Sequence, residues 1–348
     1  RLVVNAGAVL EDDDQLGLAH FVEHMAFNGS ENFDGNELVQ YLESTGSRFG
    51  PDLNAYTSFN ETVYILRVPT DDQEILDKSF LVLQDWAGGL SFDPEEIDKE
   101  RGVVLDEWRR GLGPYERIRD ELMPLLFGPR YADRLPIGTE ESLTGFEHDS
   151  AVRFYEDWYR PDLMAVIVAG DVDVEAVETR IQELFGTLEP REGPERVRFD
   201  IPEQDGPLYT VYADPELTAS SIAVIAKQDA PQAKTERDWR ENEAGNLAAL
   251  VLNERLSSLA REPDSAFLGA GGGKTRMSPT EGGHRFGGRL KEGRELEGFE
   301  AILREVRRFR EHGVTAVELE TAKVQGSTIS VLLSESDSQL AVRCPQRP

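Results

Sequence analysis

The sequence predicts an α+β protein with about two domains. Its expected strands and helices are grouped along the chain, without the strict alternation that a doubly wound parallel sheet would show. The length of 348 residues is about twice the usual ~150-residue domain. Residues 188–194 are polar and contain proline and glycine, which is the composition of a linker. We therefore expect one domain over residues 1–190 and another over residues 191–348.

Hydrophobic periodicity and turn residues predict the elements of the first domain. An apolar stretch over residues 16–27 predicts a helix that is hydrophobic almost all round and therefore buried. A second helix begins at Asp93, which is a suitable N-cap before Pro94, and runs to Trp108. The other expected elements are strands at residues 2–4, 53–59, 62–68 and 163–170, helices near 35–45, 71–90, 149–159 and 174–185, and a loop over 128–138.

The second domain is expected to begin with two strands and to continue with three helices. The strands are predicted near residues 208–212 and 220–226, and the helices near 236–260, 296–312 and 316–333. A glycine-rich run between them ends in Gly273-Lys274-Thr275. A phosphate-binding loop would need glycine at the position of Leu268, so we expect a flexible glycine loop and no nucleotide site.

Composition excludes several classes of partner. The formal net charge of −29 argues against nucleic acid and anionic membranes. No apolar run approaches the ~18 residues of a membrane-spanning helix, so we expect no membrane insertion. The single cysteine, Cys344, rules out an internal disulfide and leaves the compartment open. The chain begins inside an expected strand and stops without a closing element, so we expect both ends to be boundaries of a fragment.

The most informative motif is His20-Phe21-Val22-Glu23-His24. Histidines at positions i and i+4 lie on one face of a helix, where both imidazoles can reach one metal ion. Glu23 flanks the same face and can take a proton from water. The order is the reverse of H-E-x-x-H and matches the H-x-x-E-H signature. Such a pair also arises by chance on surface helices, but three ionisable groups on a buried turn are costly without a cation.

A catalytic zinc site usually needs a third protein ligand. The helix predicted from Pro94 carries Glu100 and Glu107, which are seven residues apart and share a face. Spacing alone does not choose between these two acids. The remaining histidines, which lack a spaced partner, are expected to be surface residues: His148, His284 and His312.

These motifs resemble the pitrilysin/insulinase family of inverzincin zinc peptidases, and look nearest to its bacterial PqqL-like branch. The resemblance rests on segments that occur in the same order: residues 1–7, 17–30, 50–59, 62–64, 100–108 and 158–165. It implies two similar domains, each an antiparallel sheet with helices packed on it. The first would be the zinc-binding peptidase domain, and the second a non-zinc domain that is cut short, so that the chain is an N-terminal half.

The resemblance also implies the roles of the site residues. His20, His24 and Glu107 would be the ligands of Zn²⁺, and Glu23 would be the catalytic general base. Glu100 would be a second acid that orients and supports the site. The function implied is a zinc-dependent endopeptidase that hydrolyses peptides with zinc-activated water.

The same family implies what else the site requires. Asn54 and Ala55 would lie on an edge strand that pairs with the backbone of a peptide substrate. Family members complete the site with an arginine and a tyrosine from a second half or a partner chain. Here Arg261 falls near the comparable place, but Phe267 follows it where a tyrosine is expected. We therefore expect the C-terminal half of the protein, or a partner subunit, to be required, and the fragment alone to be poorly active. A bacterial periplasmic location is favoured over a cytoplasmic one by resemblance.

Two alternatives remain. Some relatives are non-catalytic scaffolds or partner subunits of the same fold, and these lose the zinc residues. The other alternative is a metal-dependent hydrolase of non-peptide substrates. The presence of His20, Glu23, His24 and Glu107 together favours an enzyme over a scaffold.

Overall fold

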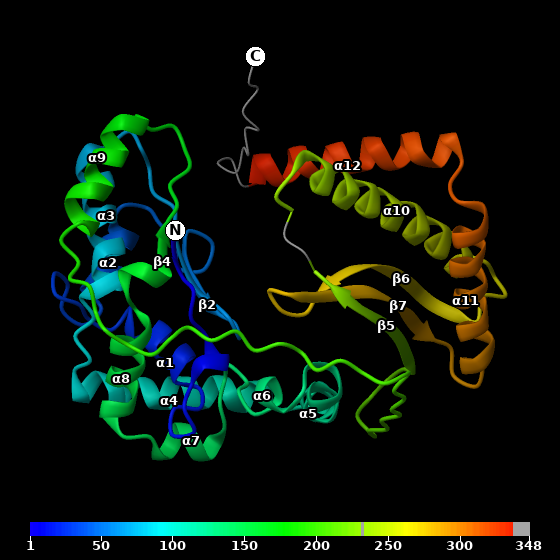
Figure 1. The fold of residues 1–348 in the computed structure, drawn as a ribbon, viewed down its shortest axis with the longest axis horizontal. Coiled ribbons are helices and arrows are strands. Elements are labelled where there is room, and N and C mark those ends of the chain that lie inside the picture. The colour runs from blue at the N-terminus through cyan, green and yellow to red at the C-terminus, as the bar shows by residue number, and fades with distance from the viewer. Residues whose placement is uncertain (231–232, 337–348) are drawn as a thin grey trace. The chain divides into compact units, whose positions relative to one another are not determined.

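A computed structural model describes residues 1–230 and 233–336 (Figure 1). These residues form two compact units, Arg1–Phe199 and the chain from Asp200 onward. Each unit contains one antiparallel sheet with helices packed against it, which confirms the α+β prediction. Cys344 lies outside the described residues. None of the helices in the described ranges is long and apolar enough to cross a bilayer.

The sheet of the first unit has the strand order β2-β3-β1-β4. Strand β1 (Leu2–Val4) lies between β3 (Thr62–Leu66) and β4 (Met164–Val166). Strand β2 (Leu53–Thr57) pairs with β3 from Leu53 opposite Leu66 to Thr57 opposite Thr62. Within the described residues, β2 therefore has one edge without a neighbouring strand.

The helices of the first unit surround a core that includes Phe21, Tyr64, Trp86 and Phe154, all at most 2% exposed. Most of these helices are predicted from the sequence, but α5 and α7 are not, and α6 falls where a loop is predicted. The bounds are α1 Leu18–Met25, α2 Glu37–Ser44, α3 Gln73–Gly88, α4 Pro94–Gly111, α5 Pro114–Phe127, α6 Pro129–Ala132, α7 Glu140–Gly145, α8 His148–Trp158 and α9 Val174–Phe185. Two 3₁₀ turns cover Ala8–Leu10 and Pro161–Leu163.

Helix α4 begins as the sequence predicts. The side chain of Asp93 accepts hydrogen bonds from the backbone N–H groups of Glu95 and Glu96, and Pro94 occupies the first turn. Proline is tolerated there because its missing N–H would have no partner within the helix. This start fixes the phase of α4, and with it the direction in which its later acidic side chains project.

The sheet of the second unit has the order β5-β7-β6, formed by Ser221–Asp229, Glu281–Leu290 and Phe267–Arg276. Its helices are α10 (Glu236–Ala260), α11 (Glu295–His312) and α12 (Ala316–Ser336). The buried cluster of this unit contains Leu256 of α10, Ile302 of α11, and Phe267 and Leu290 of the sheet.

Two predictions for the second unit are wrong. Residues 208–212 form no strand, and Tyr209 and Val211 are 88% and 95% exposed. The glycine run at 269–275 is not a flexible loop but lies within β6. Gly272 lies too close to its neighbours to carry a side chain: a Cβ on Gly272 would lie 2.8 Å from Cβ of Phe286, and the Gly272 N–H donates to Asn253 Oδ1 at 2.7 Å.

Candidate metal centre

The helix that carries the H-x-x-E-H motif has an unusual N-terminus. Gly17, at its N-cap, adopts a left-handed conformation with φ of 87°, and no cap residue supplies a side-chain acceptor. The missing acceptor comes from Glu11, which is fully buried. Its Oε2 accepts from the Gly17 N–H at 3.0 Å and its Oε1 from the Ala19 N–H at 2.9 Å. Both oxygens of Glu11 thus accept from backbone N–H groups at the N-terminus of α1 that have no partner within the helix. The sequence does not reveal this role of Glu11, because an acceptor six residues before the N-cap follows no known sequence motif.

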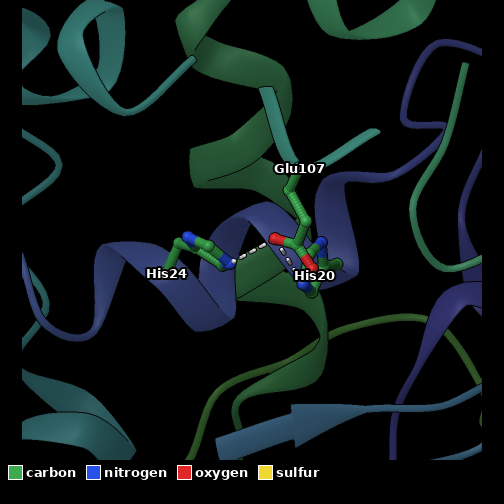
Figure 2. A group of neighbouring side chains, drawn as sticks. All are labelled: His20, His24 and Glu107. Atoms are coloured by element: carbon green, nitrogen blue, oxygen red, sulfur yellow. Dashed lines mark ion pairs between the residues drawn. The ribbon is translucent and has the colours of Figure 1, made fainter. Parts of the chain in front are cut away.

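Three potential metal ligands meet between α1 and α4. Figure 2 shows the two imidazole rings of α1 beside the carboxylate of Glu107. Oε2 of Glu107 lies 3.8 Å from Nε2 of His20 and 3.4 Å from Nε2 of His24. One ligand atom from each of the three residues lies within 4.8 Å of the others. The predicted histidine pair and one of the two candidate acids are therefore close enough to bind a single ion.

The other candidate acid, Glu100, has a different position. It is buried, and its Oε1 lies 2.8 Å from Nδ1 of His24. Because an ionised carboxylate only accepts, Nδ1 must carry the proton, which leaves Nε2 of a neutral His24 free to bind a metal. Asn28 donates from Nδ2 both to Glu100 Oε2 at 2.8 Å and to the His24 carbonyl at 3.1 Å. The sequence analysis did not identify this role of Asn28, although Asn28 lies four residues, about one helical turn, after His24.

Electrostatics distinguish the two histidines. Burial and, to a smaller extent, the charge of His24 together lower the pKa of His20 to about 4, although the charges of Glu107 and Glu100 oppose this shift. Burial also lowers the pKa of His24, but hydrogen bonds to Glu100 and Glu107 outweigh this effect and raise it to about 9. The hydrogen bond with His24 in turn holds the pKa of Glu107 below its usual value. His20 therefore offers a lone pair at neutral pH, whereas His24 must release a proton before it binds a cation.

This donor set fits zinc. Two imidazole nitrogens and one carboxylate oxygen form a common catalytic zinc ligand set, and such sites keep a fourth position for water or substrate. The side chain of Glu107 is 49% exposed, so the ligand cluster is accessible from solvent. The hydrogen bond from His24 to Glu100 is the type of outer contact that metal-binding histidines usually make.

Glu23 projects from the same helix and is only 6% exposed. Thr57, the last residue of β2, donates its hydroxyl to Oε2 of Glu23 at 2.6 Å. Burial raises the pKa of Glu23 to about 6, although the hydrogen bond from Thr57 opposes this shift. Thr57 is a further residue that sequence reasoning missed, because nothing in the spacing of the two residues links them.

The free edge of β2 presents backbone groups beside this cluster. The Ser58 N–H donates to the Glu61 carbonyl, and the Arg67 N–H donates to the Asp52 carbonyl. Hydrogen-bonded pairs alternate along an antiparallel ladder, so the backbone groups of Ala55 point away from β3. In agreement with this orientation, the Ala55 N–H donates to Oδ1 of the Asn54 side chain at 2.9 Å and not to β3.

The remaining sequence candidates are not part of this cluster. His148 Nε2 lies 2.8 Å from Asp98 Oδ1, His284 lies in β7, and His312 ends α11. In the described part of the chain, none of the three belongs to a group of three potential metal ligands. Arg261 lies at the C-terminus of α10 in the second unit, where it donates to Glu254 Oε1.

Comparison with known proteins identifies relatives of both units. The model of the insulinase family (peptidase family M16) matches residues 1–115, and the model of the peptidase M16 inactive domain matches residues 145–325. A probable zinc protease PqqL of Haemophilus influenzae is 34% identical over 280 residues. That alignment covers 80% of this chain and 30% of the relative.

Two solved structures share the fold closely. The crystal structure of the periplasmic protease PqqL from Escherichia coli matches with a TM-score of 0.83 and 28% identity, covering 98% of this chain and 38% of that chain. The crystal structure of the first half of the same protease also matches with a TM-score of 0.83 and 28% identity, and this match covers 74% of that chain. The chain thus spans about a third of the length of the curated relatives it matches.

Proposed function

We propose, since this chain belongs to the insulinase family (peptidase family M16), that it is the metal-binding part of a zinc-dependent endopeptidase. The observation that carries the proposal is the convergence of His20, His24 and Glu107 within 4.8 Å, with Glu23 on the same helix as the two histidines. An intact ligand set with an adjacent base favours an enzyme over a non-catalytic scaffold of the same fold.

In this proposal His20, His24 and Glu107 hold the zinc ion. When bound, zinc polarises a carbonyl group and lowers the pKa of water toward ~7. Glu100 does not bind the metal but fixes the proton of His24 on Nδ1 and so turns Nε2 toward the ligand cluster. Asn28 holds Glu100 in that position.

Glu23 acts as the general base. Its carboxylate takes a proton from the attacking water and later delivers it to the amine that leaves when the peptide bond breaks. The raised pKa of about 6 suits both steps, because a group that titrates near the working pH can accept and return a proton. Burial excludes bulk water from most of the carboxyl group.

The peptide substrate binds as an added strand along the free edge of β2. The outward backbone groups of Ala55 are available for main-chain hydrogen bonds, which place few demands on the substrate side chains. Because the side chain of Asn54 holds the Ala55 N–H, we expect an arriving peptide to displace it. This route favours peptides over the non-peptide substrates of other metal-dependent hydrolases.

Metal analysis tests the ligand assignment. We expect purified full-length protein to hold about one zinc ion per chain, as catalytic sites of this type do. The His20→Ala and His24→Ala variants should lose it. His148→Ala is the matched control, because this histidine pairs with Asp98 away from the cluster. Zinc at the wild-type level in both His20→Ala and His24→Ala would refute the assignment.

We further propose that the remainder of the protein, or a partner subunit, completes the peptidase. Holding zinc needs residues of the first unit only, whereas positioning a peptide for attack depends on groups from both halves, and misplaced groups lose much of the rate. The 348-residue piece should therefore bind zinc and cleave peptides poorly, and adding the C-terminal half should restore cleavage. Robust hydrolysis by the isolated piece, abolished by Glu23→Gln, would contradict this part of the proposal.

A periplasmic location is proposed as well, on the likeness to the periplasmic protease PqqL of Escherichia coli. Cell fractionation of the full-length protein tests it. Recovery of the protein with cytoplasmic markers alone would contradict it.

A further inference from the structure

The hydroxyl of Thr57 connects two elements of the site that are distant in sequence. It donates to Oε2 of Glu23 at 2.6 Å, from the end of β2 to the middle of α1. Within the described part of the chain, it is the only hydrogen bond to the carboxyl group of Glu23. It ties the proposed base to the strand that is proposed to bind the substrate.

The direction of this hydrogen bond is determined by the acceptor, because an ionised carboxylate carries no proton to donate. Thr62 lies opposite Thr57 in the sheet, with 3.5 Å between their Oγ1 atoms. Thr62 is fully buried and donates its proton to the Ala6 carbonyl at 3.1 Å. Thr62 therefore has no proton for Thr57, and the single proton of Thr57 goes to Glu23, which at 2.6 Å is the shorter of its two contacts. The donor therefore engages one carboxylate oxygen, Oε2, and leaves Oε1 for another partner.

The backbone of Thr57 lies on the free edge of β2. It is two residues from Ala55, so its N–H and C=O point away from β3 in the same way. A peptide that pairs along this edge would thus bind to the same residue whose side chain fixes the base. Any shift of β2 moves both the peptide and the donor to Glu23.

We propose that Thr57 is a positioning residue for hydrolysis. Its hydroxyl orients the Glu23 carboxylate with Oε1 available for proton transfer, and its place on β2 keeps that oxygen in register with the bound peptide. This inference rests on the proposed function of Glu23 as general base. Orientation of this kind affects the rate, because a small misplacement of a catalytic group greatly reduces turnover.

The test compares Thr57→Val with Thr57→Ser in the full-length protein, on an internally quenched peptide that the wild type cleaves. Valine keeps the shape and removes the donor, whereas serine keeps the donor. We expect Thr57→Val to lower kcat by about tenfold to a hundredfold, which corresponds to the loss of a hydrogen bond to a charged group. KM and zinc content should stay at the wild-type level, and Thr57→Ser should restore most of kcat.

Thr62→Val is the matched control, because it removes the facing buried hydroxyl, which donates to a backbone carbonyl and not to Glu23. We expect it to lower the melting temperature and to leave kcat within about threefold of the wild type, well short of the loss expected for a hydrogen bond to a charged group. Wild-type kcat in Thr57→Val, or an equal loss of kcat in Thr62→Val, would overturn the inference. Both outcomes are distinct from failure of the proposed function, which would appear as normal turnover in Glu23→Gln.

Discussion

Glu100 and His24 form a hydrogen bond of 2.8 Å between Oε1 and Nδ1, which leaves Nε2 of His24 3.4 Å from Oε2 of Glu107. Two acids on the same face of α4 therefore occupy different positions in one cluster. Glu100 contacts Nδ1 of the imidazole, and Glu107 faces Nε2, the nitrogen that is proposed to bind zinc.

This difference predicts a ranking of zinc affinity. Glu107→Gln should weaken zinc binding more than Glu100→Gln does, because outer contacts typically contribute only about 10–100-fold. A chelator competition titration measures both variants. Glu95→Gln, an exposed acid in the first turn of α4, is the control and should bind zinc as the wild type does. A greater loss in Glu100→Gln would exchange the roles of the two acids.

The pKa of His24 predicts how zinc binding depends on pH. In the metal-free protein this pKa is raised to about 9, so His24 carries a proton that zinc must displace. Affinity should therefore rise with pH, by about tenfold per unit between about pH 6 and pH 8. Titrations in buffers of different ionisation enthalpy should show release of a proton at pH 7.

Glu100→Gln is the control for this pH dependence. It removes one of the carboxylates that raise the pKa of His24, so the increase of affinity with pH should be smaller than in the wild type. Affinity that does not change with pH in the wild type would show that His24 is already neutral in the metal-free protein.

The buried carboxyl group of Glu11 predicts a second pH effect, this time on stability. Burial raises its pKa from 4.5 to about 8, against the opposing hydrogen bonds from Ala19 and Gly17. The folded state then holds this proton more strongly than the unfolded state. The stability that the group contributes is complete below about pH 4.5 and is lost as the pH rises to about 8.

Glu11→Gln has no proton to lose, so its melting temperature should fall less than that of the wild type between about pH 5 and about pH 9. Scanning calorimetry of the metal-free protein measures this difference. Glu121→Gln, an exposed acid on α5, should follow the wild-type curve. Parallel curves for Glu11→Gln and the wild type would mean that Glu11 does not titrate in this range.

The sequence predicts much of the first unit because its local signals agree with its packing. The apolar run around His20 is long and periodic enough to predict a buried helix, and Asp93 with Pro94 marks the start of α4. Nothing local distinguishes Glu107 from Glu100, since their difference depends on how α4 packs against α1. The expected preference for Glu107 came from family resemblance, and its role as a ligand stays a prediction.

The errors in the second unit have a different cause. Glycine has a low preference for strands, so residues 269–275 read as a loop, yet pairing with β7 and the contact of Gly272 with Asn253 hold them in β6. Residues 208–212 have the opposite character, being rich in strand-forming residues but unpaired in the described structure. Strand propensity depends on a partner strand, which a local pattern cannot supply.

The contacts of Glu11 and Thr57 show the same limit at the site. Each reaches α1 from a segment whose position depends on the tertiary fold. A motif search identifies groups that are adjacent on one helix, but not the side chains that orient them from outside it.

The most direct test of the central claim is Glu23→Gln in the full-length protein, measured for both zinc content and peptide hydrolysis. Glutamine keeps the size and the hydrogen-bonding capacity of glutamate but cannot accept the proton. The account predicts zinc at the wild-type level and a loss of kcat of about 10²–10⁴-fold, the usual contribution of general acid–base catalysis. Turnover close to the wild-type rate, with zinc retained, would contradict the account and assign the base to another residue.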